Sequence, residues 1–204
     1  MKKYNLLRTA LLAVLLLLAA EVRFREDVAA KQEEISAKVI RFHVRANSDS
    51  YEDQELKMAV KEAVVGYMEE ILKGAQSAEQ SAGIINEHME DILLVASERM
   101  HELGYSYDLR GYLVKEYFPL RVYADVALPP GEYTAFRIDM GEARGKNWWC
   151  MLYPALCFVD VTHGVVPDEN KEELKNVIGE EDYTVVDTYS LEFKYLKFLN
   201  KYVE

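Results

Sequence analysis

The sequence is short of basic residues and of basic clusters, and this shortage excludes a class of partner. Its 24 Lys and Arg residues face 35 Asp and Glu residues, so the formal net charge is −11. No basic cluster is longer than the pair Lys2-Lys3. A chain of this charge repels polyanions, and we expect no nucleic-acid partner. Disorder is also excluded, because 50% of the 204 residues are hydrophobic, enough for a sizeable core.

Common catalytic and cofactor-binding motifs are missing as well. The chain has no G-x-S-x-G nucleophile elbow, no H-E-x-x-H metal motif and no phosphate-binding glycine loop. Residues 141–147 hold two glycines but lack the spacing and the terminal Ser or Thr of a P-loop, so we interpret them as a hairpin loop. We therefore expect no cofactor.

Cysteine is scarce, with Cys150 and Cys157 as the two thiols of the chain. Outside the cytoplasm they can form one intramolecular disulfide, and otherwise they are two buried thiols. The C-x6-C spacing does not fit the usual zinc sites, which would need two further ligands. No two of the four histidines lie at short ligand spacing. We expect no bound metal.

The N-terminus has the composition of an export signal. Lys2, Lys3 and Arg8 precede the apolar run TALLAVLLLLAA at residues 9–20. A charged segment followed by an apolar run of this length is typical of a secretory signal, and it is shorter than the roughly 20 residues of a comfortable membrane span. Leu18 disfavours cleavage, so the segment is either a cleaved signal or an uncleaved anchor that contacts the membrane. The rest of the chain is expected outside the cytoplasm.

Patterning beyond this segment predicts one α+β domain. We divide the chain into a signal or anchor at 1–20, a tether at 21–36, a folded domain at 37–163 and a packed C-terminal helix and strand extension at 164–204. Period-two alternation predicts strands near residues 40–45, 108–117, 121–126, 133–140 and 148–153. Apolar positions at helical spacing predict two main helices, one ending near Gly74 and one running from Ser77 to Gly104. We expect an antiparallel or mixed sheet with both helices on one side.

The first strand alternates apolar and basic side chains. Arg41, His43 and Arg45 share one face, which we expect to be solvated or to meet a partner. Asn47 and Asp49 follow at the strand end, before a helix N-terminus, a position that suits anions and catalysis. One interpretation is a hydrolase that uses His43 and Asp49. The interpretation that we favour is a helix cap beside an exposed strand face.

Asn147, Trp148 and Trp149 open the strand at residues 148–153 and form the second candidate group. The two tryptophans must point to opposite faces of a strand. We expect one in the core and the other either facing solvent, where it could anchor a partner, or covered by the C-terminal extension. The alternative is that both are buried.

Four motifs resemble the stage II sporulation protein R family. They are R-x-H-V-x-A-N-S-D-S at residues 41–50, Y-F-P at 117–119, L-P-x-G-x-Y at 128–133 and G-K-N-W-W-C-x-x-x-P-x-L-C-F at 145–158. The likeness runs from about residue 40 to 160, and the C-terminal extension matches in character alone.

This resemblance implies a secreted signalling protein without catalytic activity. Proteins of this family are exported from the forespore into the space between the two sporulation membranes. There they activate a membrane-embedded aspartic protease, which removes the pro-sequence of the early mother-cell sigma factor. The resemblance supplies no catalytic or ligand residues. An exported hydrolase of cell wall or of a phosphate ester, centred on His43 and Asp49, is the alternative.

The candidate partner contacts are therefore the two groups described above, one on the first strand and its end and one at the start of the strand at residues 148–153. They are Arg41, His43, Arg45, Asn47, Asp49, Asn147, Trp148 and Trp149, beside a strand that a Cys150–Cys157 bridge would fix. Charge reversal at Arg41 with Arg45 is expected to weaken activation without unfolding the domain.

Overall fold

The computed structural model describes residues 29–195 apart from 124–125, 156 and 158–165, with a few single positions before residue 29. For residues 188–195 it describes the backbone alone. A helix over residues 29–38 comes first. The elements that follow are β1 (Ile40–Arg45), α2 (Tyr51–Ile71), α3 (Ala78–Glu87), α4 (Met89–Glu102), β2 (Leu109–Phe118), β3 (Arg121–Tyr123), β4 (Val126–Leu128), β5 (Gly131–Met140), β6 (Asn147–Tyr153), α5 (Asp168–Ile178) and α6 (Glu180–Tyr195).

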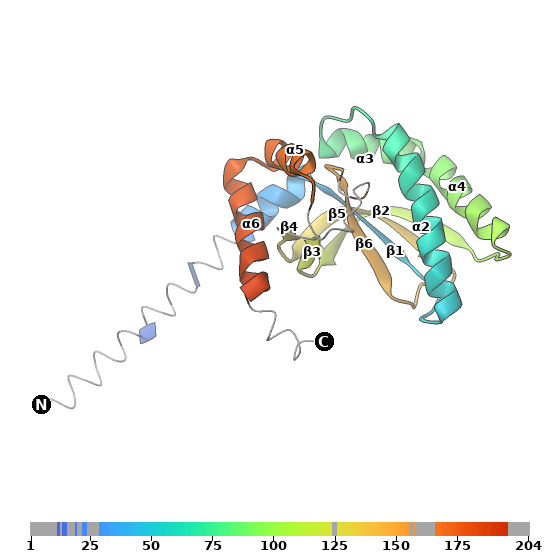
Figure 1. Cartoon of the computed structure of the whole chain (residues 1–204), viewed down its shortest axis with the longest axis horizontal. Coiled ribbons are helices and arrows are strands. Elements are labelled where there is room, and N and C mark those ends of the chain that lie inside the picture. Colours follow the sequence, from blue (N-terminus) through green and yellow to red (C-terminus); the bar gives the residue numbers. More distant parts are fainter. Residues whose placement is uncertain are drawn as a thin grey trace, which may run out of the picture.

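The main sheet has four strands in the order β2-β5-β1-β6 and is mixed (Figure 1). β1 runs parallel to β5 and antiparallel to β6, while β2 and β5 are antiparallel. β3 and β4 form a separate two-stranded ribbon. The expected α+β class and the mixed sheet are confirmed. Because β1 has a strand on either side, its residues can reach solvent only through the two faces of the sheet.

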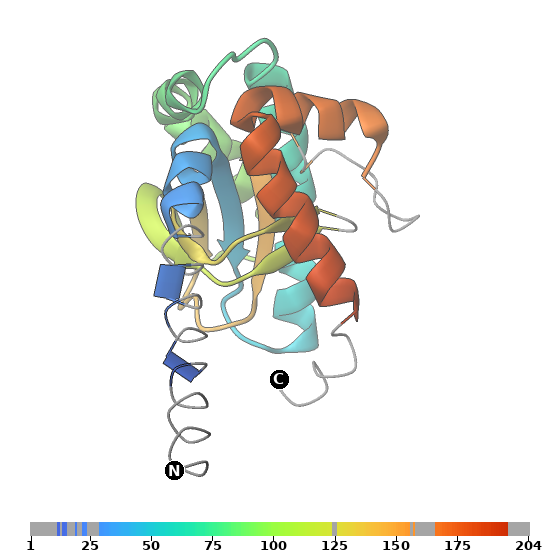
Figure 2. The ribbon, with the colours of Figure 1, turned by 90° about the vertical axis from the view of Figure 1, so that its left-hand side faces the viewer.

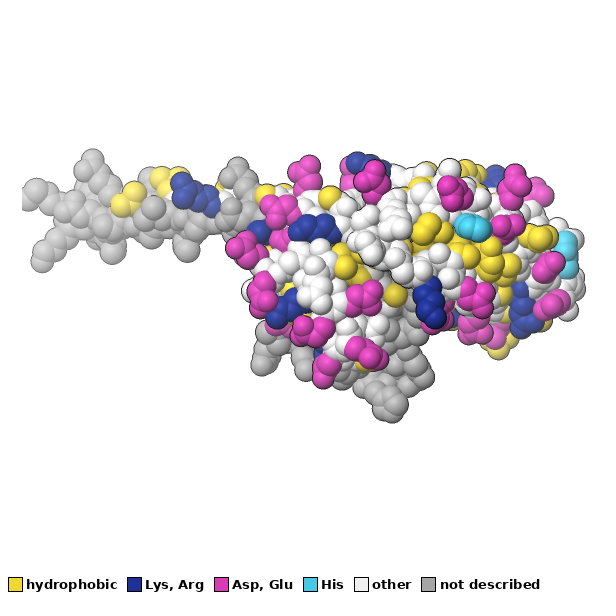
Figure 3. Space-filling view, turned by 90° about the horizontal axis from the view of Figure 1, so that it is seen from above, with side chains coloured by type: hydrophobic (Ala, Val, Ile, Leu, Met, Phe, Trp, Pro, Cys, Tyr) yellow, Lys and Arg dark blue, Asp and Glu magenta, His cyan; other side chains and the backbone are white. Residues whose placement is uncertain are grey.

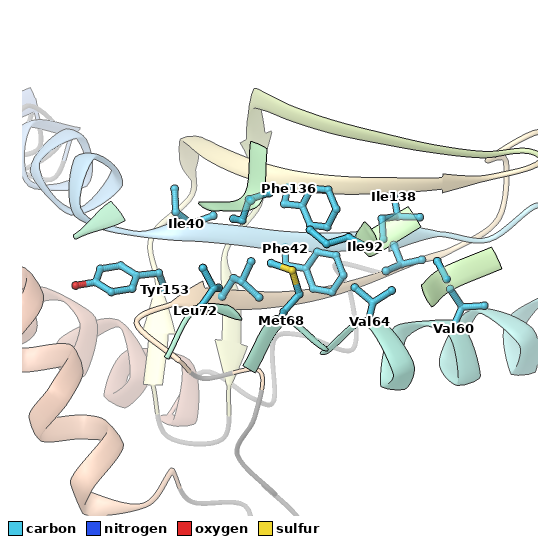
Figure 4. Close-up of a cluster of buried hydrophobic side chains, with 14 of the residues drawn as sticks. Ile40, Phe42, Val60, Val64, Met68, Leu72, Ile92, Phe136, Ile138 and Tyr153 are labelled. Carbon is cyan, nitrogen blue, oxygen red and sulfur yellow. The ribbon is translucent and has the colours of Figure 1, made fainter. Parts of the chain in front are cut away.

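The first face of the sheet carries an apolar core under α2, α3 and α4 (Figures 1 and 4). Phe42 of β1 stacks on Phe136 of β5, with ring centroids 5.4 Å apart, and both are fully buried. Val60, Val64 and Met68 of α2 point toward them from the facing helix (Figure 4). The predicted apolar stripe of this helix is therefore confirmed, and it explains why α2 packs on this face.

The second predicted helix is wrong in one respect, because it is two helices. The chain leaves helical geometry at His88, where φ is −98° and ψ is 12°. His88 lies beside Tyr67 of α2, with the ring and the hydroxyl 3.4 Å apart. The break changes the direction of the chain, so that Ile85 of α3 and Ile92 of α4 both reach the core. Periodicity within each half could not reveal this bend.

A second core lies on the opposite face, under segments from both ends of the described chain (Figure 2). Ile35 of the 29–38 helix, Leu128 of β4 and Val186 of α6 are all fully buried there. Over residues 166–195 the predicted C-terminal extension contains two helices, α5 and α6, and both contribute buried side chains to this core. The segment expected to be a tether is, over residues 29–38, a helix packed on the same face.

A buried carboxylate joins these two end segments. Asp182 of α6 is 3% exposed and lies 2.9 Å from Lys38 Nζ and 3.2 Å from Lys31 Nζ. Burial would raise the pKa of Asp182, but hydrogen bonds from Lys38 and Lys31 outweigh it and hold the pKa below its usual value. The helix of residues 29–38 is thus held to α6 by charge as well as by apolar contact.

The face of the molecule seen from above carries many acidic side chains (Figure 3). Asp and Glu side chains are spread over the face seen in Figure 3, in keeping with the net charge of −11. Within the described residues, no helix combines the length and apolar character needed to cross a bilayer. The predicted signal or anchor at residues 1–20 lies almost wholly outside the described residues.

Candidate partner-binding site

Arg41 and His43 lie inside the protein, so the expected exposed basic face is wrong for both. Arg41 is 0% and His43 2% exposed. The physical reason is that the second face of the sheet is covered by the 29–38 helix, the β3–β4 ribbon and α6 (Figure 2). Arg45, at the end of the strand, is 32% exposed. Charge reversal at Arg41 would now be expected to disrupt the fold, because it would bury an unpaired carboxylate.

His43 lies in a neutral state between an aromatic ring and a carboxylate. Its ring stacks on Trp149 at 4.7 Å, and its Nε2 is 2.8 Å from Glu116 Oε2. Burial, then the nearby charges of Arg137 and Arg45, lower the pKa of His43 to about 3. The same Glu116 carboxylate is also paired with Arg137. Since a carboxylate accepts, the neutral ring donates its Nε2–H to Glu116.

Arg45 is fixed by a two-pronged ion pair. Its Nε and Nη2 each lie 2.6 Å from an oxygen of Asp139, the residue beside it in the β1–β5 register. Arg137 Nε approaches the same carboxylate at 3.3 Å. Burial would raise the pKa of Asp139, but Arg45 and Arg137 outweigh it and lower the pKa. These residues are therefore structural, and the ion pair fixes the direction in which the Arg45 side chain points.

The loop after β1 is organised by a buried carboxylate in the first turn of α2. Asp53 Oδ2 accepts from Asn47 Nδ2 at 2.9 Å and from Ser48 Oγ at 2.5 Å, and Tyr107 also bonds this carboxylate. Burial would raise the pKa of Asp53, but these hydrogen bonds hold it below its usual value. Ser50 caps the helix by accepting from the Asp53 N–H. The predicted capping role of this loop is confirmed.

The loop between β5 and β6, residues 141–146, is hydrogen-bonded to this first loop. The Glu142 N–H donates to Asn47 Oδ1 at 2.9 Å, and the Lys146 N–H donates to Asp49 Oδ1 at 2.6 Å. Asn47 and Asp49 therefore use their side chains to join two loops that lie far apart in the sequence.

Gly145 allows the two loops to come this close. A Cβ at Gly145 would collide with the carbonyl oxygen of Ser48, so another residue would push the loops apart. The motif of residues 41–50 and the motif of residues 145–158 thus meet at one place. The structure brings together two patterns that the sequence presents about 100 residues apart.

Exposed side chains surround this contact between the loops, and we call them the loop-junction surface. Tyr51 is 75% exposed, and the side chains of Glu142 and Arg144 are 68% and 80% exposed. Asp49 and Lys146, which join the two loops, are also exposed. This surface combines both signs of charge with one large aromatic ring on a hydrogen-bonded backbone. Such a combination suits binding to another protein.

The two tryptophans point to opposite faces of β6, as predicted, but neither is an exposed anchor. Trp148 meets Phe42 edge to face at 5.8 Å and carries Lys61 over its ring at 5.0 Å. Trp149 lies against His43 on the other face. Both tryptophans are half-buried. Asn147, which precedes them, is also half-buried, and its side-chain oxygen has no hydrogen-bond partner among the described residues.

A disulfide joins Cys150 of β6 to Cys157 in the turn that follows. The expectation of a single bridge agrees with this, and the thiols are not available as metal ligands. Across the described part of the chain, no group of three or more His, Cys, Asp or Glu side chains is placed to hold a metal ion.

The hydrolase alternative finds no support in this geometry. Within the described residues, His43 contacts Glu116 and Trp149 on the second face of the sheet. Asp49 instead accepts from the Lys146 amide at the loop junction. A general base must lie within hydrogen-bond reach of the group that it activates, and these two side chains belong to separate networks.

Sequence reasoning missed the partners that neutralise the buried polar face. Periodicity does not single out Glu116, Arg137 and Asp139 as ion-pair partners, although Arg137 and Asp139 alternate with apolar residues in the predicted strand at residues 133–140. A signal was present, because two strands each carried a row of charged side chains opposite an apolar row. Pairing those rows side by side would have indicated ion pairs between the strands.

The fold and the site define an α+β protein with a surface suited to binding another protein. A family model described as stage II sporulation protein R matches residues 36–163. The stage II sporulation protein R of Bacillus subtilis (strain 168) is 36% identical over 157 residues, covering 74% of this chain and 70% of that protein. No solved structure matches. The chain belongs to the stage II sporulation protein R family and has a role in sporulation.

Proposed function

We propose that this protein is an exported sporulation signal that activates a membrane-embedded aspartic protease. The protease would then remove the pro-sequence of the early mother-cell sigma factor. Membership of the stage II sporulation protein R family supports this proposal. The observation that carries its structural part is the meeting of two family-like motifs at the loop-junction surface.

Activation by a ligand requires that the ligand bind the active state of its receptor better than the inactive state. The loop-junction surface would provide this difference through Asp49, Tyr51, Arg144 and Lys146. Hydrogen bonds from the Glu142 and Lys146 amides to the side-chain oxygens of Asn47 and Asp49 hold the backbone in place before binding. A surface that is ordered in advance loses less entropy on binding, so more of its contact energy remains to shift the receptor.

Export would place this surface on the same side of the membrane as the extracytoplasmic part of the protease. The charged and apolar segment at residues 1–20 supports export from the forespore into the space between the membranes. If this segment stays in the membrane, residues 21–28 separate it from the packed helix. Eight residues span at most roughly 28 Å, so an anchored domain would stay close to the bilayer.

A reconstitution in a non-sporulating bacterial host tests the proposal. The full chain, the candidate protease and the sigma-factor precursor would be co-expressed, and the size of the precursor followed on a gel. The matched control is the same chain without residues 1–20, which keeps the domain in the cytoplasm. We expect processing with the full chain, and none when the chain is omitted or retained inside.

Processing in the absence of this chain would contradict the proposal, and so would unprocessed precursor beside a folded and exported chain. In that second case the purified chain would be tested for hydrolysis of cell wall and of phosphate esters. We expect no turnover in these assays.

A further inference from the structure

Arg41 carries a buried charge that lacks an anionic partner in the described chain. Its guanidinium lies 4.4 Å from the Phe118 ring centre and 4.9 Å from that of Tyr133. Its Nη2 donates to the Tyr123 hydroxyl at 2.6 Å, and its Nε donates weakly to the Cys150 carbonyl at 3.4 Å. Nη1 is buried and finds no acceptor among the described residues.

Arg121 brings a second cation to the same place. Its guanidinium lies 4.6 Å from the Trp149 ring centre, and its buried Nε has no acceptor among the described residues. Arg121 and Tyr123 alternate with Val122 along β3, so both face inward while Val122 is 36% exposed. Burial and the nearby charge of Arg41 lower the pKa of Arg121. The two like charges therefore repel each other.

The other two arginines of this face each have a carboxylate partner, which Arg41 and Arg121 lack among the described residues. Arg45 and Arg137 have carboxylates, Asp139 and Glu116, within ion-pair distance. No carboxylate contacts Arg41 or Arg121 in the part of the chain that the structure describes. Buried charges in proteins are normally paired, because an isolated one costs several kcal/mol. Within the described chain, Arg41 and Arg121 therefore lack the charge partner that Arg45 and Arg137 have.

We propose that Arg41 and Arg121, with the Tyr123 hydroxyl, form a binding site for a carboxylate, either an acidic side chain or the C-terminus of a peptide. Guanidinium groups bind carboxylates through parallel hydrogen bonds in one plane. The rings of Phe118 and Trp149 lie beside the two guanidinium groups. The carboxylate would enter beside β3, where Arg121 and Tyr123 are half-buried. This site goes beyond the proposed function and does not depend on it.

Thermal unfolding of the full chain in a mild detergent tests the site with acetate as the probe. Potassium acetate would replace potassium chloride at constant ionic strength, and tryptophan fluorescence would follow unfolding. We expect a saturable rise of about 3–6 °C in Tm at ten times the Kd of acetate. Arg121→Gln should abolish this rise. Arg144→Gln, which removes an 80% exposed arginine of the loop junction, should keep it.

Three outcomes would overturn the inference. A rise of equal size in the unmodified chain and in both variants would be a general effect of the salt. A rise that does not saturate, or no rise at all, would show that the cluster binds no carboxylate. The same measurement is repeated with potassium sulfate. If sulfate raises the Tm more than acetate does, and the rise depends on Arg121, the site binds tetrahedral anions and the carboxylate proposal is wrong.

Discussion

The two faces of the β-sheet are both buried, yet they are stabilised in different ways. On the first face Phe42 and Phe136 meet helices through apolar contacts alone. On the second, Arg41 and His43 lie at the same depth among aromatic rings and ion pairs. Apolar burial is favourable for each side chain by itself. Burial of charge is tolerated only where partners offset the loss of water, so the second face should be far more sensitive to pH and to single charge changes.

The largest expected effect comes from breaking the apolar face. Phe42→Ala removes a fully buried ring and its stacking on Phe136. We expect a loss of about 3–5 kcal/mol in the free energy of unfolding, measured by urea denaturation. Leu94→Ala is the control, because Leu94 is 57% exposed on α4, and it should change stability by less than about 0.5 kcal/mol. Equal losses in both variants would contradict the assignment of this core.

The second largest loss of stability is expected when one carboxylate is removed from the second face. Asp139→Asn leaves Arg45 and Arg137 without their shared partner. We expect a loss of about 2–3 kcal/mol, less than for a fully buried pair, because Arg45 is 32% exposed. Glu142→Gln breaks an ion pair of two exposed side chains and should cost less than about 0.5 kcal/mol. If Asp139→Asn behaves like this control, the ion pairs do not stabilise the face.

The pH dependence of stability should separate the two faces further. The pKa of His43 falls from 6.5 to about 3 on folding, so the unfolded chain binds a proton more readily than the folded one between these values. The contribution of His43 to the free energy of unfolding is therefore fully present above about pH 6.5. It decreases as the pH falls below this value, by up to about 1.4 kcal/mol per pH unit. Urea denaturation from pH 7.5 to 5 measures this slope.

His43→Gln should flatten that slope, whereas His88→Gln, at a partly exposed histidine between α3 and α4, should keep it. An unchanged slope in His43→Gln would mean that another group controls the pH dependence.

The smallest expected effect on stability lies at the contact between the 29–38 helix and α6. Lys38→Met removes one of the two lysines that neutralise Asp182. We expect a loss of about 0.5–1 kcal/mol, because Lys31 remains and Lys38 is 40% exposed. Lys73→Met, at an exposed lysine after α2, is the control and should be neutral. A neutral Lys38→Met would show that apolar contacts alone hold the 29–38 helix in place.

The sequence predicted which side chains share a face, but it could not predict that the second face is covered. Alternation in the predicted strand at residues 133–140 puts Phe136, Ile138 and Met140 on one side, and all three lie in the first core. The same alternation put Arg41 on the opposite, polar side of its strand, which predicts an exposed side chain. Its cover comes from the β3–β4 ribbon, α6 and residues 29–38, which are remote in sequence, and local periodicity carries no information on such contacts.

The candidate site was predicted in part, for a similar reason. The capping chemistry of residues 48–50 was readable, because N-cap preferences are local. The hydrogen bonds that Asn47 and Asp49 accept from the second loop could not be read from the sequence, since they depend on the sheet order that places β1 between β5 and β6. The sequence indicates that Gly145 lies in a loop, but it does not show that a Cβ there would collide with the carbonyl oxygen of Ser48 in another loop.

The central claim is that the loop-junction surface, rather than the basic row of β1, meets the protease. The most direct test is precursor processing in the reconstituted host with Arg144→Glu combined with Lys146→Glu. These changes leave the backbone hydrogen bonds of both residues available. The control, Lys73→Glu combined with Lys115→Glu, reverses two exposed charges elsewhere. We predict roughly tenfold slower processing in the first variant and normal processing in the control. Normal processing by a folded, exported loop-junction variant would contradict the account.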